Sequence, residues 1–152
     1  MAETGACNSI PTLSFLERLG RLSTTSSRHP PQTGDRIRSS QPEDIAISAI
    51  TLAELEYGAA KSLYPDRNRL ALLQFLLSFT IVDFDQEAAS QYGLIRAMLE
   101  SRGIPIGPID MLLAAQAKSR GLVLVTNNEH GFRRVPDLRV DNWTALDRRQ
   151  KS

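Results

Sequence analysis

The feature that most constrains the fold is a short and almost entirely apolar run at residues 122–126, Leu-Val-Leu-Val-Thr. Strands of this kind are typical of a parallel sheet whose two faces are both covered, because apolar and polar side chains do not alternate along them. Two further apolar runs, at residues 45–50 and 80–84, also precede segments with helical periodicity. Strands that alternate with helices predict an α/β sandwich with a mainly parallel sheet.

Apolar residues at helical spacing predict four helices between these strands and around them. Proline suits the first turn of two of the helices, and Asp85 is a candidate N-cap for a third. Gly103 and Gly121 are candidate stops at the ends of helices. A last short strand is expected at residues 138–140. The predicted helices cover residues 51–62, 65–77, 86–101 and 108–120.

The composition changes abruptly before the first of the three apolar runs. Residues 23–41 are dense in Ser, Thr, Pro and Arg, and such a stretch buries too little apolar surface to offset its ordering entropy. We therefore predict a largely irregular segment over residues 1–41, a folded domain over 42–143 and a polar tail over 144–152. Within the first segment, leucines at helical spacing favour a short helix over residues 12–22.

Composition excludes several classes of function. Lys and Arg total 18 against 17 Asp and Glu, so any contact with nucleic acid must come from a local patch. A single cysteine, Cys7, excludes internal disulfides and a multi-cysteine zinc site. Two histidines, His29 and His130, are too few for a histidine-rich metal centre. Neither a membrane-spanning apolar run nor a signal region is recognisable. We expect a cytoplasmic protein whose chemistry uses carboxylates.

Three polar groups fall where the carboxyl ends of parallel strands gather, which is where such sheets bind ligands. Glu54 lies early in the first predicted helix, and Asp110 lies in the first turn of the helix that a proline opens. Asn127 and Asn128 directly follow the last of the three apolar runs. Such hard oxygen ligands suit Mg²⁺ or Mn²⁺. A metal held in this way can activate water for attack on a phosphodiester.

Each of these groups also has a purely structural interpretation. Thr51 and Glu54 fit a capping box, in which the glutamate returns to the start of its own helix. The helix dipole alone favours an acid at the position of Asp110. Asn127 and Asn128 are residues that make turns. Spacing alone favours these structural roles, because capped helix starts are common.

Three motifs carry a resemblance to a known family. They read Ile-Ser-Ala-Ile-Thr-Leu-Ala-Glu-Leu-Glu-Tyr-Gly at residues 47–58, Ile-Pro-Ile-Gly-Pro-Ile-Asp-Met-Leu-Leu-Ala-Ala at 104–115, and Leu-Val-Thr-Asn-Asn at 124–128. In this order and spacing, the region over residues 42–143 resembles the VapC toxins, which are PIN-domain ribonucleases of bacterial toxin–antitoxin pairs. The resemblance implies a PIN-like α/β/α sandwich, a Mg²⁺-dependent endoribonuclease activity (with Mn²⁺ as an alternative) and inhibition by a VapB-like antitoxin. It also implies a homodimer or a toxin–antitoxin hetero-oligomer.

The resemblance also implies roles for the candidate residues. Glu54 takes the place of the family's second acid and Asp110 that of its third, so that both would hold or orient the metal. Asn128 stands where many PIN domains place a fourth acid and is the third candidate catalytic residue. The family usually continues with Arg-Glu-Phe, whereas residues 130–132 read His-Gly-Phe here. An acid is therefore missing, and Glu129 is out of register to replace it.

The largest departure from the family is at its first motif. VapC toxins open with a buried strand that ends Leu-Asp-Thr-Asn, whose aspartate is a principal metal ligand, and this chain has no such motif. We therefore expect the first strand to be missing or altered. Two carboxylates bind Mg²⁺ less firmly than three or four, so we expect weak or absent nuclease activity. The alternative is a catalytically dead remnant that binds an antitoxin or self-associates.

A shifted reading frame is one hypothesis for this departure. The codons AAC TCG ATA CCA AC are one set that can encode residues 8–12. Read two bases later, the same nucleotides give Leu-Asp-Thr-Asn. The nucleotide sequence of the gene tests this hypothesis, since other codons at these positions would exclude it.

Two surfaces are candidates for binding. Four arginines could hold RNA, although each can equally be an ordinary solvated residue. The apolar helix segment at residues 70–77 could form an interface with an antitoxin or a second copy, or could pack in the core. The four arginines are Arg67, Arg69, Arg133 and Arg134.

Overall fold

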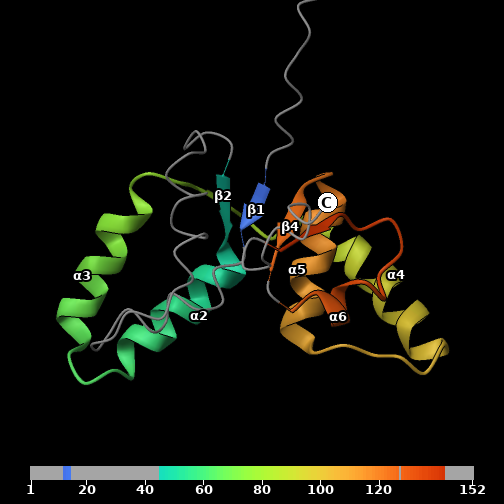
Figure 1. The fold of residues 1–152 in the computed structure, drawn as a ribbon, viewed down its shortest axis with the longest axis horizontal. Coiled ribbons are helices and arrows are strands. Elements are labelled where there is room, and N and C mark those ends of the chain that lie inside the picture. Colours follow the sequence, from blue (N-terminus) through green and yellow to red (C-terminus); the bar gives the residue numbers. More distant parts are fainter. Residues whose placement is uncertain (1–11, 15–44, 127, 143–152) are drawn as a thin grey trace, which may run out of the picture.

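The computed structural model describes residues 12–14, 45–126 and 128–142. Within these ranges the chain forms one five-stranded sheet whose neighbouring strands all pair in parallel, in the order β3-β2-β1-β4-β5 (Figure 1). The predicted α/β fold with a parallel sheet is confirmed. The strands are β1 (Thr12–Ser14), β2 (Ile45–Ser48), β3 (Thr80–Val82), β4 (Val123–Val125) and β5 (Val140–Asp141).

Helices connect the strands and lie on two sides of them. Figure 1 shows α2 and α3 on one side, and α4, α5 and α6 on the other. Within the described ranges, no helix combines the length and the apolar character that a membrane span requires. The helices are α2 (Ala49–Ala60), α3 (Pro65–Leu76), α4 (Gln86–Ser101), α5 (Pro108–Ser119) and α6 (Glu129–Phe132).

The first strand, which we expected to be missing or altered, is present as β1, so only the expectation that it is missing is wrong. β1 lies in the middle of the sheet, where Thr12 pairs with Ile45 on one side and with Val123 on the other. The prediction of a helix over residues 12–22 is wrong at residues 12–14, which form β1. The rest of that range lies outside the described residues. Pairing explains the difference, because without β1 the facing edges of β2 and β4 would leave buried N–H and C=O groups unpaired.

The start of α2 differs from the prediction by two residues. The helix begins at Ala49 because the Ser48 hydroxyl accepts a hydrogen bond from the backbone N–H of Ile50 at 3.0 Å. Serine is a favoured N-cap, so the predicted strand ends earlier and the helix starts earlier than periodicity suggested. The helix ends at Ala60 rather than at residue 62.

Other predicted helix boundaries are confirmed. Asp85 is the N-cap of α4, and its carboxylate accepts a hydrogen bond from the backbone N–H of Ala88 at 3.0 Å. Gly103 and Gly121 follow α4 and α5 with φ of 68° and 63°, a backbone conformation that glycine adopts without steric penalty.

The main core lies around α5. Its central residues are buried against α4 and the sheet, and several of them are alanines, which let neighbouring elements approach closely. Leu113 on α5, Leu124 on β4 and Phe132 on α6 are completely buried in the same cluster. By contrast, Leu72 is the only buried residue of α3.

The apolar side chains of α3 therefore do not all serve the core. Leu70, Leu73 and Leu77 are exposed, and Leu77 retains 86% of its accessible surface. Phe75 is half-buried and lies against Phe79, with ring centroids 4.9 Å apart. Of the two interpretations of residues 70–77, the exposed leucines favour an interface over plain core packing.

Candidate active site

The candidate site lies at the carboxyl edge of the sheet. Because the strands are all parallel, their carboxyl ends share this edge, where α2 leaves β2 and α6 follows β4 (Figure 1). The direction in which successive strands are added reverses between β1 and β4. In open parallel sheets, ligands bind in the crevice outside such a switch point.

Asp110 lies at this edge in the first turn of α5, and its side chain is partly buried. Burial raises the pKa of this carboxyl above its ordinary value, since less polar surroundings disfavour the charged form. The helix dipole alone would lower the pKa, so it does not explain the environment of this acid. Within the described residues, no cation or hydrogen-bond donor offsets the burial. A carboxylate held in this way is a candidate metal ligand.

Glu54 comes from α2, on the other side of the strands (Figure 1), and is exposed to solvent. The capping-box interpretation of this residue is wrong, because Ser48 rather than Thr51 is the N-cap of α2. The glutamate lies more than a turn beyond the cap, too far to return to it. Its carboxylate forms no hydrogen bond or ion pair with the part of the chain that the structure describes.

Asn128 follows β4 and stands at the N-cap position of α6 without a side-chain capping bond. Its backbone N–H donates to the Thr126 hydroxyl at 3.0 Å, which supports the turn that was one interpretation of this segment. A β-carbon added to Gly131 would lie 3.9 Å from Asn128 Nδ2 and 3.7 Å from Ile106 Cγ2. Asn128 is thus brought beside the loop that leads to Asp110. Asn127 lies outside the described residues.

Glu129 does not replace the missing acid. One carboxylate oxygen accepts a hydrogen bond from Arg133 at 3.1 Å, and the other accepts from Asn142 Nδ2 at 3.4 Å. Both oxygens are therefore engaged on the side of α6 that faces β5. By contrast, Gly131 has room for a side chain, because the nearest atoms would be at ordinary van der Waals distance.

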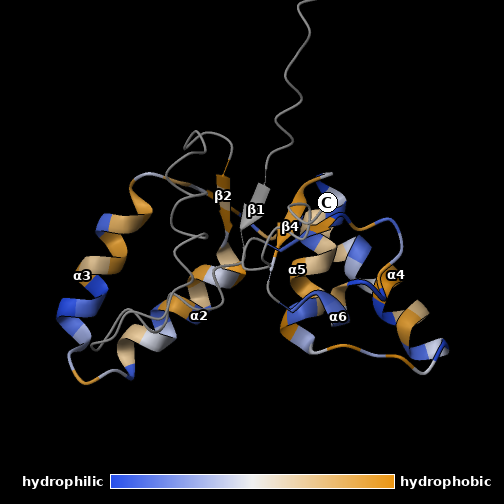
Figure 2. Ribbon diagram, in the orientation of Figure 1, coloured by the Kyte–Doolittle hydropathy of each residue, from blue (hydrophilic) through white to orange (hydrophobic). Residues whose placement is uncertain are grey.

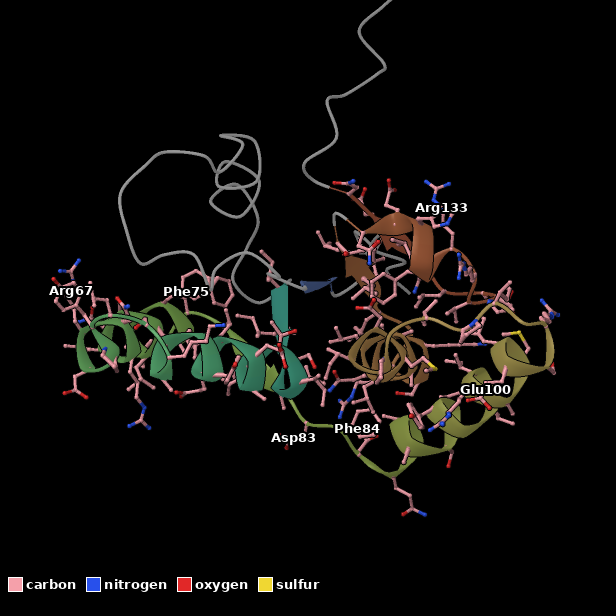
Figure 3. All side chains as sticks on the ribbon, turned by 90° about the horizontal axis from the view of Figure 1, so that it is seen from below. Arg67, Phe75, Asp83, Phe84, Glu100 and Arg133 are labelled. Atoms are coloured by element: carbon pink, nitrogen blue, oxygen red, sulfur yellow. The ribbon has the colours of Figure 1, made fainter. Side chains whose placement is uncertain are left out.

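The four candidate arginines do not form one patch. Figure 3 shows Arg67 and Arg133 at opposite sides of the molecule. The guanidinium of Arg67 lies 5.6 Å from the ring centroid of Tyr64, and Arg69 forms an ion pair with Glu56 at 3.4 Å.

Arg134 is the arginine tied most closely to the candidate site. It donates to the Pro105 carbonyl, in the loop before α5, at 3.1 Å, and its other terminal nitrogen lies 3.3 Å from Nε2 of the exposed His130. Of the four, Arg133 and Arg134 directly follow α6, the helix that begins after Asn128.

The donor set offers oxygen rather than nitrogen or sulfur. Within the described ranges, no three His, Cys, Asp or Glu side chains converge as a metal site would require. Two carboxylates and an amide oxygen fit a divalent ion that keeps several of its waters, as Mg²⁺ commonly does. The unpartnered and partly buried Asp110 is the observation that favours such an ion.

Sequence reasoning missed a group of buried polar residues at the same edge. Ser48 was expected inside a strand, and Gln116 lies in an alanine-rich helix that gave no sign of a polar role. The signals that could have revealed them were a serine at a strand-to-helix junction and a lone glutamine on an otherwise apolar helix face. The buried polar residues within the described ranges are Ser48, Thr51, Gln116 and Thr126.

The sequence also matches known proteins. The family model of the PIN domain matches residues 27–138. The tRNA(fMet)-specific endonuclease VapC of Salmonella typhimurium is 48% identical over 99 residues, which cover 65% of this chain and 75% of that protein. The protein of the same description from Shigella flexneri is 41% identical over 120 residues, covering 79% of this chain and 90% of that protein.

Solved structures share the fold. The toxin–antitoxin complex VapBC from Salmonella typhimurium, bound to DNA, superposes with a TM-score of 0.71 at 43% identity and covers 75% of this chain and 86% of the matched chain. FitAcB from Neisseria gonorrhoeae superposes with a TM-score of 0.74 at 27% identity, covering 89% of this chain and 99% of the matched chain.

Proposed function

The chain belongs to the PIN-domain family as a VapC-type endoribonuclease toxin of a type II toxin–antitoxin pair, and we propose that its substrate is tRNA(fMet). Two relatives that share 48% and 41% of their aligned residues with it are endonucleases specific for this RNA. The observation that carries the assignment of a site is Asp110, a partly buried carboxylate with a raised pKa at the carboxyl edge of the sheet.

We assign roles to the residues at this edge as follows. VapC nucleases are metal-dependent in general, and we propose Mg²⁺, with Mn²⁺ as an alternative, held by Asp110 and Glu54. Such an ion supplies an activated water and stabilises the leaving oxygen. Asn128 would orient a ligand through its side-chain amide. Arg133 and Arg134 would hold a phosphate of the RNA, since guanidinium groups match phosphate geometry.

A VapB-like antitoxin is the proposed partner. Homologous toxins are found in complexes with antitoxins, as in VapBC from Salmonella typhimurium. The exposed leucines on α3 and at its C-cap are the proposed contact, because a partner would remove Leu70, Leu73 and Leu77 from water. The same contact would serve a homodimer or a toxin–antitoxin hetero-oligomer. We propose that the chain acts in the cytoplasm, where tRNA is found.

One observation favours a second candidate, a catalytically dead remnant that still binds its antitoxin. The central strand β1, Thr12–Ser14, contains no acid, although the family places its principal metal ligand at the end of this strand. Two carboxylates alone would then hold the metal weakly.

Cleavage of purified tRNAs decides between these candidates. The full chain is incubated with tRNA(fMet) and with an elongator tRNA, in Mg²⁺, in Mn²⁺ and in chelator, beside Asp110→Asn. The proposed function predicts metal-dependent cleavage of tRNA(fMet) that falls by at least about 100-fold in the variant. No cleavage by a chain shown to be folded and to bind an antitoxin would select the remnant. Equal cleavage of both tRNAs would overturn the proposed substrate alone.

A further inference from the structure

A buried chain of hydrogen bonds joins the two helices that carry the candidate metal ligands. The Ser48 hydroxyl accepts from the N–H of Ile50 at the start of α2 and donates to Oε1 of Gln116 on α5. The Gln116 side-chain nitrogen donates in turn to the Val82 carbonyl at the end of β3, at 2.8 Å. Ser48 and Gln116 are both fully buried. The two hydrogen bonds of the Gln116 amide therefore lie away from bulk water.

The positions of these residues relate them to the two carboxylates. Glu54 follows Ser48 along α2, and Asp110 precedes Gln116 along α5, in each case by less than two helical turns. A helix is stiff over such a length, so a bond that fixes one residue also fixes the other. Ser48 and Val82 are partners in the register of β2 and β3, so the glutamine binds the ends of two adjacent strands at once.

Packing alone does not explain a glutamine at position 116. Its neighbours on α5 are buried alanines and Leu113, and an apolar side chain of similar volume would fill the space without burying an amide. Buried polar networks whose members are all paired define one arrangement of the elements that they join. Both the oxygen and the nitrogen of the Gln116 amide are paired, so this network can set the position of α5 against α2.

We propose that Ser48 and Gln116 are positioning residues for the ribonuclease reaction, because their hydrogen bond sets the separation between Glu54 on α2 and Asp110 on α5. Neither residue is proposed to touch the RNA or the metal. The proposal rests on the proposed function, since it assumes that these two carboxylates share a metal. Misplacement of a catalytic group by about 1 Å can lower a rate by about 100-fold, so a bond remote from the chemistry can have a large effect.

A double-mutant cycle on the full-length chain tests the proposal. Ser48→Ala removes the hydroxyl, Gln116→Met removes the amide at similar volume, and the third variant carries both changes. Mn²⁺ affinity is measured by electron paramagnetic resonance, and kcat and KM are measured on tRNA(fMet) at saturating metal. We expect each single change to weaken Mn²⁺ binding and to lower kcat about tenfold with little change in KM. The double variant should lose less than the product of the two single losses, because both changes break the shared Ser48–Gln116 bond.

Asp85→Ala is the matched control for loss of a helix cap. It removes the N-cap of α4, a helix that carries neither carboxylate, so it should lower the melting temperature as Ser48→Ala does. Its Mn²⁺ affinity and kcat should stay at the wild-type values. Each measurement is made at a temperature at which circular dichroism shows the variant to be folded. Should Gln116→Met not fold, Ser48→Ala against Asp85→Ala decides the question.

The outcomes distinguish failure of the positioning role from failure of the proposed ribonuclease function. Wild-type Mn²⁺ affinity and kcat in a folded Ser48→Ala or Gln116→Met would overturn the positioning role and leave the ribonuclease intact. Losses that multiply in the double variant would also overturn it, because independent damage multiplies. A wild-type chain that binds Mn²⁺ but cuts no RNA would defeat the proposed function alone, and affinity would still test the positioning. A wild-type chain that does neither would defeat both.

Discussion

Helices α3 and α5 share the same features at their first turns but lie in different surroundings. Both have twelve residues, both place a proline in the first turn, and neither has a side-chain hydrogen bond at its N-cap. Yet α5 is buried along most of its length, whereas α3 buries Leu72 alone. Figure 2 shows hydrophobic residues on both helices, in α3 beyond its hydrophilic first turns. The comparison teaches that apolar content does not decide burial, and that small side chains such as Ala114 allow the close packing that leucines on α3 do not achieve.

The two helices also differ in the role that their surroundings allow. α5 is fixed by the core and by the Gln116 network, which suits a helix that carries a candidate metal ligand. α3 exposes leucines that a partner could cover, and it contributes only Leu72 to the core. Changes on α5 should therefore alter stability and chemistry, and changes on α3 should alter binding.

The largest expected effect comes from a matched pair of truncations. Leu113→Ala on α5 should lower the free energy of unfolding by about 2–5 kcal/mol, because it opens a cavity at a completely buried site. Leu70→Ala on α3 should change it by less than about 0.5 kcal/mol, because this leucine is exposed. Urea denaturation measures both values. Similar losses in the two variants would contradict the contrast between the helices.

A smaller effect is expected when the exposed leucines at the end of α3 are made polar. Leu73→Ser together with Leu77→Ser should weaken binding of a cognate antitoxin by about tenfold or more, as loss of apolar contacts at an interface does. The stability of the isolated chain should stay the same. Isothermal titration calorimetry measures the affinity, and Leu63→Ser, an exposed leucine outside α3, is the control. Unchanged affinity would place the antitoxin elsewhere.

A gain of stability is expected at the start of α2, the helix that contacts both α3 and α5. The Thr51 hydroxyl is buried and has no hydrogen-bond partner among the described residues. Thr51→Val should therefore raise the free energy of unfolding by about 1 kcal/mol, because it removes an unsatisfied polar atom. Thermal denaturation measures the change. A loss of stability would mean that the hydroxyl has a partner when the protein is in solution.

The smallest effect concerns the pH dependence of stability. The pKa of Asp110 is raised by burial, so the folded state holds this proton more tightly than the unfolded state does. The contribution of Asp110 to the free energy of unfolding is therefore greatest below the ordinary pKa. It is lost as the pH rises through the raised value. In the absence of metal, Asp110→Asn should raise stability at neutral pH by less than about 1 kcal/mol, because solvent screens a carboxylate that is only partly buried.

Asp85 gives the opposite sign and serves as the control. Its pKa is lowered, chiefly by the hydrogen bond from the backbone N–H of Ala88, with Arg120 contributing. Its contribution is present above the ordinary pKa and is lost as the pH falls through the lowered value. Between pH 3 and pH 7, the slope of the free energy of unfolding against pH should therefore become more positive in Asp110→Asn. The same slope should become less positive in Asp85→Asn. Slopes that change in the same direction would contradict this assignment.

The sequence predicted those features that depend on local patterns. The apolar run at β4 indicated a covered parallel strand, and the cap at Asp85 and the stop at Gly121 are confirmed because each acts through neighbouring backbone. β1 could not be predicted in this way, since Thr-Leu-Ser has no strong preference of its own and becomes a strand by pairing with two others.

The candidate site shows the same limit. Asp110 and Glu54 were identified from motifs, but the pKa of Asp110 depends on burial, which only the packed helix creates. The role of Gln116 depends on contacts with Ser48 and Val82, which are distant from it in the sequence. Periodicity describes one helix at a time and cannot reveal such contacts.

The central place of β1 in the sheet has a consequence for the order in which the chain can fold during synthesis. Thr12 pairs with Ile45 on one side and with Val123, far from it in the sequence, on the other. Pairings between distant residues form late, because the loop between them must close first. The sheet edge that holds the candidate site can therefore be completed only after β4 has been synthesised.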